Sequence, residues 1–327
     1  MDFENRATAL VVSLGLARNT DILSVKPLTG GVASDIGAVE TTAGTFCVKF
    51  ALERLRVAQD WRVPVTRNKS EYDWLSVAGQ VAPGAAPRLF GRDAALGGFA
   101  MEMIAGPDVT LWKSDLLAGR STGQEAALVA GVLGHIHAAG ASTAFDRSRF
   151  ANRDLFRDIR IEPYLSFTAT RHPKVADQLL TLADSLFDAE QTLVHGDISP
   201  KNILLRGGKP IFLDAECATM GDPSFDLAFC MNHLVLKALH VNRATLGAVG
   251  VFWRAYAPHV YWEDASRLQA RVAALIPALM LARIDGKSPV EYLSDPMRDR
   301  IRQLSLDLLT RRHATLDALI ADIGAQE

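Results

Sequence analysis

HGDISPKNIL at residues 195–204, followed by LDAE at residues 213–216, is the most informative part of this chain. Asp197 is followed by Asn202 within the first motif, and Asp214 lies in the second. An acid, an amide and a second acid in this order are the groups that phosphoryl transfer requires. We expect Asp197 to be the general base, and Asn202 and Asp214 to hold Mg²⁺ against nucleotide phosphates.

A β-hairpin is predicted between the two motifs. Residues 203–206 and 210–213 are apolar runs on either side of two adjacent glycines, which are a signal for a two-residue turn. Folding about that turn brings Asn202 and Asp214 side by side at the open end of the hairpin. Both side chains can then reach one cation.

The first motif resembles the catalytic loop, usually written HxDxxxxN, of aminoglycoside phosphotransferases and choline kinases. LDAE resembles the metal-binding segment of choline kinases and methylthioribose kinases, in which an Asp and a Glu flank one residue. The resemblance makes Glu216 a further metal ligand, directly or through water. Protein kinases usually have Lys two positions after the catalytic Asp, where this chain has Ser199. The resemblance therefore favours a small-molecule kinase.

This family resemblance also implies a fold. We expect an α+β, protein-kinase-like structure of two lobes, with a small β-rich N-lobe and a larger, mostly helical C-lobe. A chain of 327 residues exceeds the usual size of one domain, which agrees with two lobes around a cleft. The expected boundaries are 1–105 for the nucleotide-binding N-lobe and 106–327 for the C-lobe, which carries the catalytic loop, the metal site and the acceptor-binding helices.

Composition restricts the partners. The chain is 49% hydrophobic and 22% charged, as in ordinary globular proteins, and its net charge is −2. This balance gives no reason to expect nucleic acid or an anionic membrane as partner. Three unclustered cysteines indicate a reducing compartment. The first residues lack the features of a signal peptide, and the longest apolar stretch, 272–282, is too short to span a bilayer. We therefore expect a cytoplasmic protein.

Residues 28–40, LTGGVASDIGAVE, contain two glycines followed by alternating apolar positions. The pattern predicts a strand, a turn and a second strand, with the turn offering backbone N–H groups to phosphates. The nucleotide-binding residues expected here are Gly30, Gly31 and Ser34. A hairpin with no role in phosphate binding is the alternative, because Gly-Gly turns are common.

The next predicted strand, 45–50 (TFCVKF), places Lys49 on the face opposite to its bulky apolar residues. A lysine at this position is normally exposed to solvent. The following predicted helix, 67–79, has Glu71 in line with apolar residues four and seven positions later. A carboxylate in an apolar stripe is costly unless a cation pairs with it.

Lys49 is the expected partner of Glu71. The pair corresponds to the strand-Lys and helix-Glu ion pair that holds kinase lysines against the α- and β-phosphates. The alternative is that Glu71 is exposed at the helix edge near Lys69.

Residues 99–106, FAMEMIAG, resemble the strand and hinge between the two lobes of these kinases. The resemblance implies that the backbone of Glu102, Met103 and Ile104 binds the adenine edge and that Met101 lines the adenine pocket. The Gly-Pro pair at 106 and 107 ends the strand, as expected at a lobe boundary.

Other polar residues near the motifs are assigned structural roles. His195 is expected to pack and to bond backbone groups, since the base in this chemistry is the Asp. Lys201 either touches the γ-phosphate or faces solvent, and we favour solvent. Asp226 resembles the buried Asp that braces the catalytic loop through backbone N–H groups. His135 and His137, in the helix predicted at 121–141, point apart and are not expected to bind metal.

The acceptor is expected to be a small-molecule alcohol. Residues 147–174 contain seven Arg or Lys and three acids, a surplus that disfavours polycationic aminoglycosides. No aromatic cluster suggests a choline site. Methylthioribose kinases accept a neutral sugar but have an Arg pair where this chain has Arg283 followed by Ile284. We expect ATP and Mg²⁺ to be used on a neutral or weakly anionic, sugar- or polyol-like acceptor, with aminoglycoside or choline-type phosphotransfer as the alternative.

Three other classes fit less well. A nucleotide-binding pseudokinase is expected to lack the lysine, the base or a metal ligand, and all of these are present. A metal hydrolase built on His195 and Asp197 requires further ligands at metal-binding spacing. A protein kinase is disfavoured by Ser199 and by the lack of an APE-like segment after LDAE.

Overall fold

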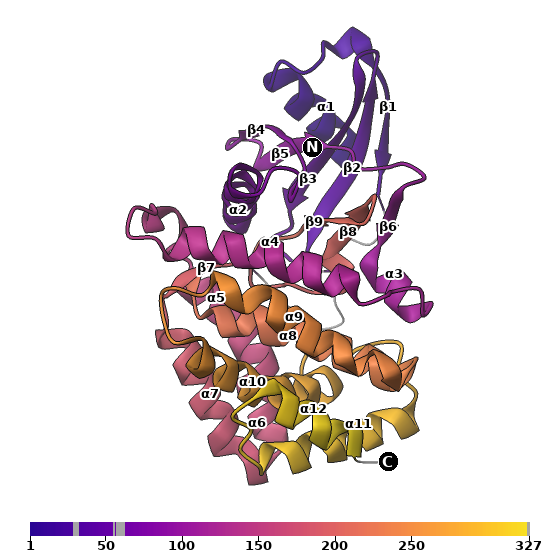
Figure 1. Ribbon diagram of the computed structural model, residues 1–327. Coiled ribbons are helices and arrows are strands. Elements are labelled where there is room, and N and C mark those ends of the chain that lie inside the picture. The colour runs from indigo at the N-terminus through magenta and orange to yellow at the C-terminus, as the bar shows by residue number, and fades with distance from the viewer. Residues whose placement is uncertain (29–32, 55, 57–62, 326–327) are drawn as a thin grey trace.

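The computed structural model describes residues 1–28, 33–54, 56 and 63–325. A β-sheet with two flanking helices forms one end of the molecule, and a larger group of helices forms the other (Figure 1). The N-terminus lies beside the sheet, and the C-terminus lies at the far end of the helical part. This is the expected α+β arrangement of two lobes.

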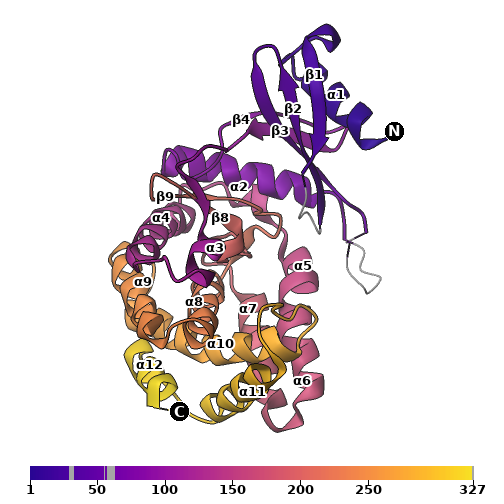
Figure 2. The same ribbon diagram turned by 90° about the vertical axis from the view of Figure 1, so that its right-hand side faces the viewer.

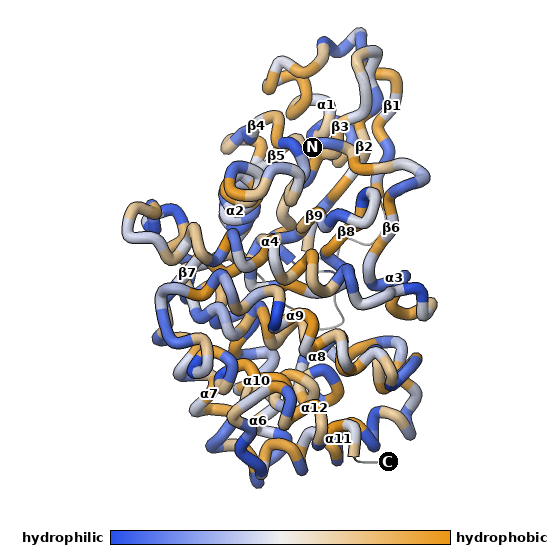
Figure 3. Tube along the Cα trace, in the orientation of Figure 1, coloured by the Kyte–Doolittle hydropathy of each residue, from blue (hydrophilic) through white to orange (hydrophobic). Residues whose placement is uncertain are grey.

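The N-terminal sheet is antiparallel, with strand order β1-β2-β3-β5-β4. Its strands are β1 (Ile22–Pro27), β2 (Ser34–Thr41), β3 (Gly44–Ala51), β4 (Leu89–Asp93) and β5 (Gly98–Glu102), and its helices are α1 (Phe3–Ser13) and α2 (Arg67–Val81). The central strands β3 and β5 are largely hydrophobic and buried, and Figure 3 colours hydrophobic residues orange. Successive side chains of a strand point to opposite faces of the sheet.

One helix covers each face of this sheet. Val48 and Phe50 of β3 pack against Leu10 of α1. Cys47, on the other face of β3, belongs to the core cluster that contains Trp74 of α2. Lys49 points to the same side as Cys47, because side chains alternate along a strand. It therefore faces α2, as the sequence predicted.

The helical lobe is built around two long buried helices, α8 (Pro223–His240) and α10 (Ala265–Asp285). Its other helices are α3 (Trp112–Leu117), α4 (Gln124–Ala141), α5 (Arg153–Phe156), α6 (Phe167–Arg171), α7 (Ala176–Asp188), α9 (Ala248–Tyr256), α11 (Asp295–Leu309) and α12 (Leu316–Ala325). Each buried apolar side chain in this core contributes about 1.5–3 kcal/mol.

Of the described residues, only α10 forms a helix long and apolar enough to cross a membrane. It packs against α8 and α11, and its residues from Leu275 to Asp285 are buried. A core helix of this kind passes the same test of length and composition, so α10 gives no sign of a membrane span.

Short strands lie between the two lobes. β6 (Val109–Leu111), β8 (Ile203–Arg206) and β9 (Lys209–Phe212) form a three-stranded sheet, and β7 (Thr192–Val194) pairs with β10 (Thr219–Gly221). In Figure 2 the β8–β9 hairpin lies next to α2, near the junction of the lobes. Gly207 and Gly208 connect β8 and β9 with φ values of 54° and 79°. Both values lie in the left-handed region, so the predicted two-residue turn is confirmed.

Two predicted helix boundaries need correction. The helix expected at 67–79 ends at Val81, so Gly79 does not terminate it. The helix expected at 121–141 begins at Gln124, because Gly123 has a φ of 87° and lies outside the helix. One element was not predicted: Arg157–Ser166 forms a π-helix of ten residues. π-helical turns are rare and are frequent at functional sites.

Candidate active site

Lys49 links the two lobes. Its Nζ donates to Glu71 Oε1 at 2.7 Å and to Asp214 Oδ1 at 2.5 Å. The side chains of Lys49 and Glu71 are almost fully buried. Burial lowers the pKa of Lys49, but the charges of Asp214 and Glu71 outweigh burial and raise it. The predicted ion pair is confirmed, and the alternative of an exposed Glu71 near Lys69 is wrong.

Asp214 is held in a strained conformation. Its φ is 67°, a value that non-glycine residues rarely adopt and that costs about 1–3 kcal/mol. Burial raises the pKa of Asp214, but Lys49 and Lys201 outweigh burial and lower it well below the ordinary range. The carboxylate is therefore ionised, with one oxygen bonded to Lys49.

The hairpin brings Asn202 next to Asp214. Leu213 N donates to Asn202 O at 2.9 Å, which places the two predicted metal ligands at the open end of β8–β9. Asn202 Nδ2 donates to Asp197 O at 3.0 Å. This bond fixes the orientation of the amide and leaves its oxygen as the group that can bind a cation.

These donors suit a hard divalent ion. Carboxylate and amide oxygens are the ligands that Mg²⁺ and Ca²⁺ prefer, and Mg²⁺ usually takes only one or two protein carboxylates together with phosphate oxygens. Within the described ranges, no group of three or more His, Cys, Asp or Glu could hold a metal on its own. Asn202 and Asp214 therefore fit an ion that arrives with phosphate ligands, and do not fit an independent protein metal centre.

Glu216 is tied to Arg67. The Arg67 Nε donates to Glu216 Oε2 at 2.9 Å, and the arginine is fully buried. Its remaining donors bond the carbonyl groups of Ala33, Leu52, Val63 and Pro64. Burial and the neighbouring Asp214 raise the pKa of Glu216. The other oxygen of Glu216 remains for a cation or a water molecule.

Arg67 was missed by the sequence analysis. It lies one helical turn before Glu71, so that both project from the same face of α2. That spacing was visible in the sequence, and it indicates that α2 directs two charged residues toward the cleft rather than one.

The predicted base, Asp197, is buried and paired with two cations. Arg160 Nη2 lies 2.9 Å and Lys201 Nζ lies 3.2 Å from Asp197 Oδ2. Burial raises the pKa of Asp197, but Lys201 and Arg160 outweigh burial and lower it. The carboxylate is therefore ionised at neutral pH.

Lys201 and Arg160 differ from expectation. The Lys201 side chain is 52% exposed, as preferred, but its ammonium also lies 3.2 Å from Asp197 Oδ2, a contact that was not predicted. Arg160 comes from the unpredicted π-helix and also donates to Gly196 O at 2.5 Å. The sequence did not distinguish Arg160 from the other cations of residues 147–174, most of which lie on the surface.

His195 and Asp226 hold the catalytic loop. Asp226 accepts from His195 N at 2.6 Å and from Gly196 N at 2.8 Å, which confirms the predicted bracing. Asp197 N donates to His195 Nδ1 at 3.1 Å, so the ring proton is on Nε2, which lies 3.1 Å from Leu213 O. Burial lowers the pKa of His195, which is therefore neutral and structural, as expected.

The two histidines of α4 have different environments. His137 is buried and contacts Tyr256 Oη at 2.7 Å and Asp226 at 3.3 Å, whereas His135 is exposed. The two side chains therefore point apart, as the spacing predicted.

The hinge residues line the cleft. Met101, Glu102, Met103 and Ile104 all border the same cavity as Lys49. The Glu102 amide donates to Arg88 O at 2.8 Å, so that amide is not free to bind a ligand. The prediction for the hinge therefore needs correction at this one group.

Gly30 and Gly31 lie outside the described residues. β1 and β2 pair as predicted, with Pro27 opposite Gly37. Ser34 is buried at the start of β2 and lines the cavity.

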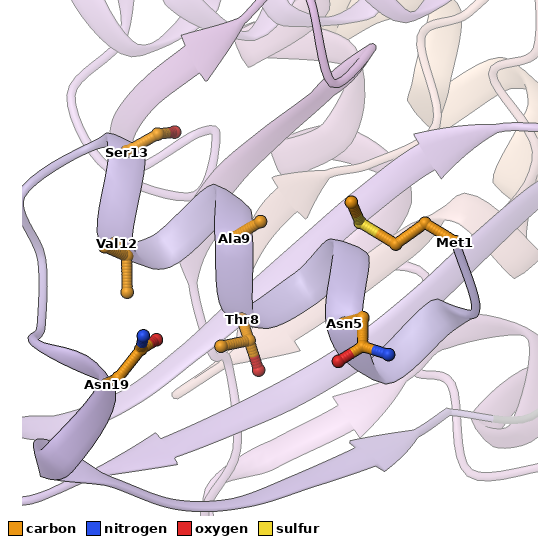
Figure 4. Close-up of a pocket in the computed structure, with 7 residues that line it drawn as sticks. All are labelled: Met1, Asn5, Thr8, Ala9, Val12, Ser13 and Asn19. Carbon is orange, nitrogen blue, oxygen red and sulfur yellow. The ribbon is translucent and has the colours of Figure 1, made fainter.

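A cavity of about 760 Å³ contains the whole constellation. Its acids are all paired with cations; these pairs are Glu71–Lys49, Asp214–Lys49, Glu102–Arg206, Asp197–Arg160 and Glu216–Arg67. Among its described lining residues, Tyr164 is the single aromatic. A second hollow lies on α1, where Asn5, Thr8 and Asn19 border it (Figure 4). No acidic or basic side chain lines that hollow, so it offers no catalytic group.

Comparison with known proteins identifies the family. A family model described as a phosphotransferase enzyme family matches residues 24–259, which include the strand lysine, the catalytic loop and the LDAE motif. This chain belongs to the phosphotransferase enzyme family. A methylthioribose kinase from Yersinia enterocolitica is 26% identical to this phosphotransferase over 248 residues, which are 67% of this chain and 62% of the relative. The match thus spans less than two thirds of that relative.

Solved structures share the fold of this phosphotransferase. A choline kinase from Streptococcus pneumoniae is 18% identical to this chain and has a TM-score of 0.58. The match covers 94% of this chain and 98% of the choline kinase. An amicoumacin kinase in complex with AMP-PNP, Ca²⁺ and Ami is 15% identical, with 97% and 98% coverage and a TM-score of 0.58. The bilobal, protein-kinase-like fold is therefore confirmed.

Proposed function

We propose that this phosphotransferase transfers the γ-phosphoryl group of ATP to a hydroxyl group of a small, sugar- or polyol-like molecule. The observation that carries the proposal is that one cavity between the lobes is lined by Lys49, Asp197, Asn202 and Asp214. These residues supply the ammonium, base and cation ligands of phosphoryl transfer. Two similar proteins are named as a methylthioribose kinase and a choline kinase, and these names support an acceptor of low molecular weight.

The nucleotide would occupy the part of the cavity bordered by β3 and the hinge. Met101 lines this part and would pack against the adenine, and Ile104, which follows β5, would offer its backbone to the adenine edge. Lys49 would exchange its bond to Asp214 for bonds to the α- and β-phosphates, while Glu71 keeps its ammonium in place. Ser34, with Gly30 and Gly31, would lie over the phosphates.

A divalent cation such as Mg²⁺ would be held by Asn202 and Asp214, with Glu216 as a further ligand, and would neutralise charge on the phosphate oxygens. Arg67 keeps Glu216 directed toward this position through its 2.9 Å bond. The strained backbone of Asp214 keeps the second carboxylate oxygen available. Such strain is common where a side chain must be presented for function.

Asp197 would accept a hydrogen bond from the acceptor hydroxyl and take its proton as the new P–O bond forms. The bond between the γ-phosphorus and the β–γ bridging oxygen breaks at the same time, and ADP leaves with that oxygen. Arg160 and Lys201 keep Asp197 ionised, so its main task is to orient the hydroxyl. A weak base suffices because the transition state is largely dissociative.

The cavity disfavours the alternative acceptors. Aminoglycosides are polycations, yet each lining carboxylate is already paired with a lysine or arginine of this chain. Choline is bound by aromatic cages, and Tyr164 alone does not make one. The pseudokinase alternative is disfavoured because the base and the cation ligands meet in one cavity. We also propose a cytoplasmic location, since the three cysteines are free and buried.

Asp197→Asn tests the proposal. We expect kcat for ATP-dependent phosphorylation to fall by a factor of about 10² to 10⁴, because a general base contributes that much. The thermal shift produced by Mg²⁺ and AMP-PNP should stay within the range of the wild type, since Asp197 is not a nucleotide ligand. Asp177→Asn, at an exposed position on α7, is the matched control and should retain full activity. Unchanged turnover in Asp197→Asn would contradict the assignment.

A further inference from the structure

Two buried basic residues of the C-lobe form no ion pair with any described carboxylate. Lys237 of α8 and Arg283 of α10 are only 3% and 8% exposed. Across the described part of the chain, neither forms an ion pair with a carboxylate. The ammonium of Lys237 lies 5.1 Å from the ring centre of Tyr292, and Arg283 Nη1 bonds Ser288 Oγ at 2.9 Å and Tyr164 Oη at 3.3 Å.

The neighbouring polar groups do not compensate these charges. Arg283 Nε, His233 Nδ1 and Tyr292 Oη are buried and make no hydrogen bond to a described residue. Burial lowers the pKa of Lys237 to about 7, and the charges of Arg283 and Lys113 add to the effect. Unpaired buried charges are strongly destabilising. A cluster of them, with spare donors, indicates a missing anion.

Two further cations stand at the cavity wall. Lys113 and Lys287 line the cavity, each with 27% of its side chain exposed. Their acidic partners, Glu291 and Glu162, are 66% and 43% exposed. The acids thus lie toward solvent, where an ion pair contributes little, and leave the inner side of the wall positive.

The cationic wall is part of the cavity that holds the proposed base. We give this name to Lys113, Lys287 and Ser288 at the surface, with Arg283 and Lys237 behind them. Ser288 joins the two layers, because it lines the cavity and accepts from Arg283. Tyr164 does the same through its hydroxyl. An anion bound to the wall would therefore contact Lys113, Lys287 and Ser288, and it would be attracted electrostatically by Arg283 and Lys237 behind them.

We propose that the acceptor carries a negatively charged group, a carboxylate or a phosphate, that binds the cationic wall while its hydroxyl lies at Asp197. This inference rests on the proposed function and narrows its substrate class. It also explains why two basic groups without an ion pair are retained in a core: an anionic substrate supplies the partner that the protein lacks. Functional sites are the places where such local rules are broken.

The first test measures anion binding without turnover. Inorganic phosphate and malonate are titrated by thermal shift at constant ionic strength, with Mg²⁺ and AMP-PNP saturating the nucleotide site. We expect a saturable increase in Tm for the wild type and for Arg254→Met, a control at an exposed position. Arg283→Met should lose that increase. An equal increase in Arg283→Met, or no saturable increase in the wild type, would overturn the inference.

A second variant covers the case in which Arg283→Met does not fold. Lys237→Met replaces an unpaired buried ammonium by an apolar chain of similar length, so the free protein should be at least as stable as the wild type. Its response to phosphate and malonate should nevertheless be weakened. A full anion response in a folded Lys237→Met protein would remove this residue from the site and contradict the two-layer wall.

The third test compares matched acceptors and separates the two anion types. Glycerol, glycerate and glycerol 3-phosphate form one set, and ribose, ribonate and ribose 5-phosphate form the other. We expect a charged member to have a kcat/KM at least about tenfold above its neutral counterpart, because a charge-assisted contact discriminates by this much. Arg283→Met should raise KM for that member by roughly 10- to 100-fold, with little change in KM for ATP.

The outcomes distinguish the inference from the proposed function. If the neutral members are phosphorylated in preference to the charged ones, and Asp197→Asn abolishes this activity, the anionic acceptor is overturned and the kinase assignment stands. If the wild type forms no more ADP than Asp197→Asn does, with any acceptor or with water, the proposed function is overturned. In that case anion binding to the cationic wall would no longer concern an acceptor, and the inference would also fail.

Discussion

The ammonium of Lys49 lies 2.5 Å from Asp214 Oδ1, so a strand of the N-lobe is joined directly to the segment that follows β9 in the C-lobe. Glu71 completes the arrangement at 2.7 Å from the same ammonium. Two carboxylates from different lobes therefore share one buried cation. Any nucleotide that takes Lys49 must replace the bond to Asp214, which couples phosphate binding to the relative position of the lobes.

Lys49→Met is predicted to destabilise the protein through Glu71. The variant leaves Glu71 buried without its cation, which costs about 3–5 kcal/mol of unfolding free energy. The double variant Lys49→Met/Glu71→Leu should recover part of that loss, because Glu71 is no longer left unpaired, whereas Asp214 still lacks its bond to Lys49. Urea denaturation measures both. Lys69→Met removes a half-exposed lysine from Asp73, which keeps Arg149 as a partner, so this control should cost less than about 1 kcal/mol. Equal effects at Lys49 and Lys69 would contradict the buried pair.

Asp226→Asn is predicted to lower stability and activity together. Asp226 is fully buried and accepts from the backbone N–H groups of His195 and Gly196. An amide cannot accept both bonds with the same strength, so we expect a loss of about 2–4 kcal/mol and a fall in kcat. Asp264→Asn changes an exposed N-cap of α10 and should stay within about 0.5 kcal/mol. A stable but inactive Asp226→Asn enzyme would instead indicate a direct chemical role.

The turn between β8 and β9 is predicted to control the cation site. Gly208→Val forces a β-branched residue into a φ of 79°, which costs about 1–3 kcal/mol and shifts the hairpin that aligns Asn202 with Asp214. The apparent affinity for Mg²⁺ in the ATP reaction should fall. Gly207→Asn, at a φ of 54°, should be tolerated because Asn adopts this conformation readily. Mg²⁺ titrations that do not differ between the two variants would disprove the link.

Lys237 is predicted to make stability depend on pH. Burial lowers its pKa from 10.5 in the unfolded chain to about 7 in the folded protein. Between these values the unfolded state binds more protons, so the free energy of unfolding rises with pH across this window. Below the folded pKa the destabilisation is fully present. Lys237→Met should remove this slope, and the exposed Lys174→Met should not. If the urea midpoints of Lys237→Met and of the wild type change in the same way from pH 7 to 10, the lowered pKa of Lys237 is contradicted.

Short-range patterns account for the parts of this protein that were predicted correctly. The two-residue turn, the side of β3 that carries Lys49 and the face of α2 that carries Glu71 follow from local periodicity. The order of motifs along 195–216 predicted that Asp197, Asn202 and Asp214 would meet, and all three line one cavity. These features depend on residues close together in the chain, where backbone geometry alone decides which side chains share a face.

The sequence by itself determined the lobes, the hairpin and the buried lysine pair, and it led to the proposal of Asp197 as the base. The tertiary structure alone decided which cations pair with which acids, Arg160 with Asp197 and Arg67 with Glu216, and it buried Arg283 and Lys237 without an ion pair to a described carboxylate. The physical reason is that an ion pair is selected by distance and burial after packing. The sequence does not show which arginines and lysines are buried, or which of them lie close to a carboxylate. Both depend on how the chain packs.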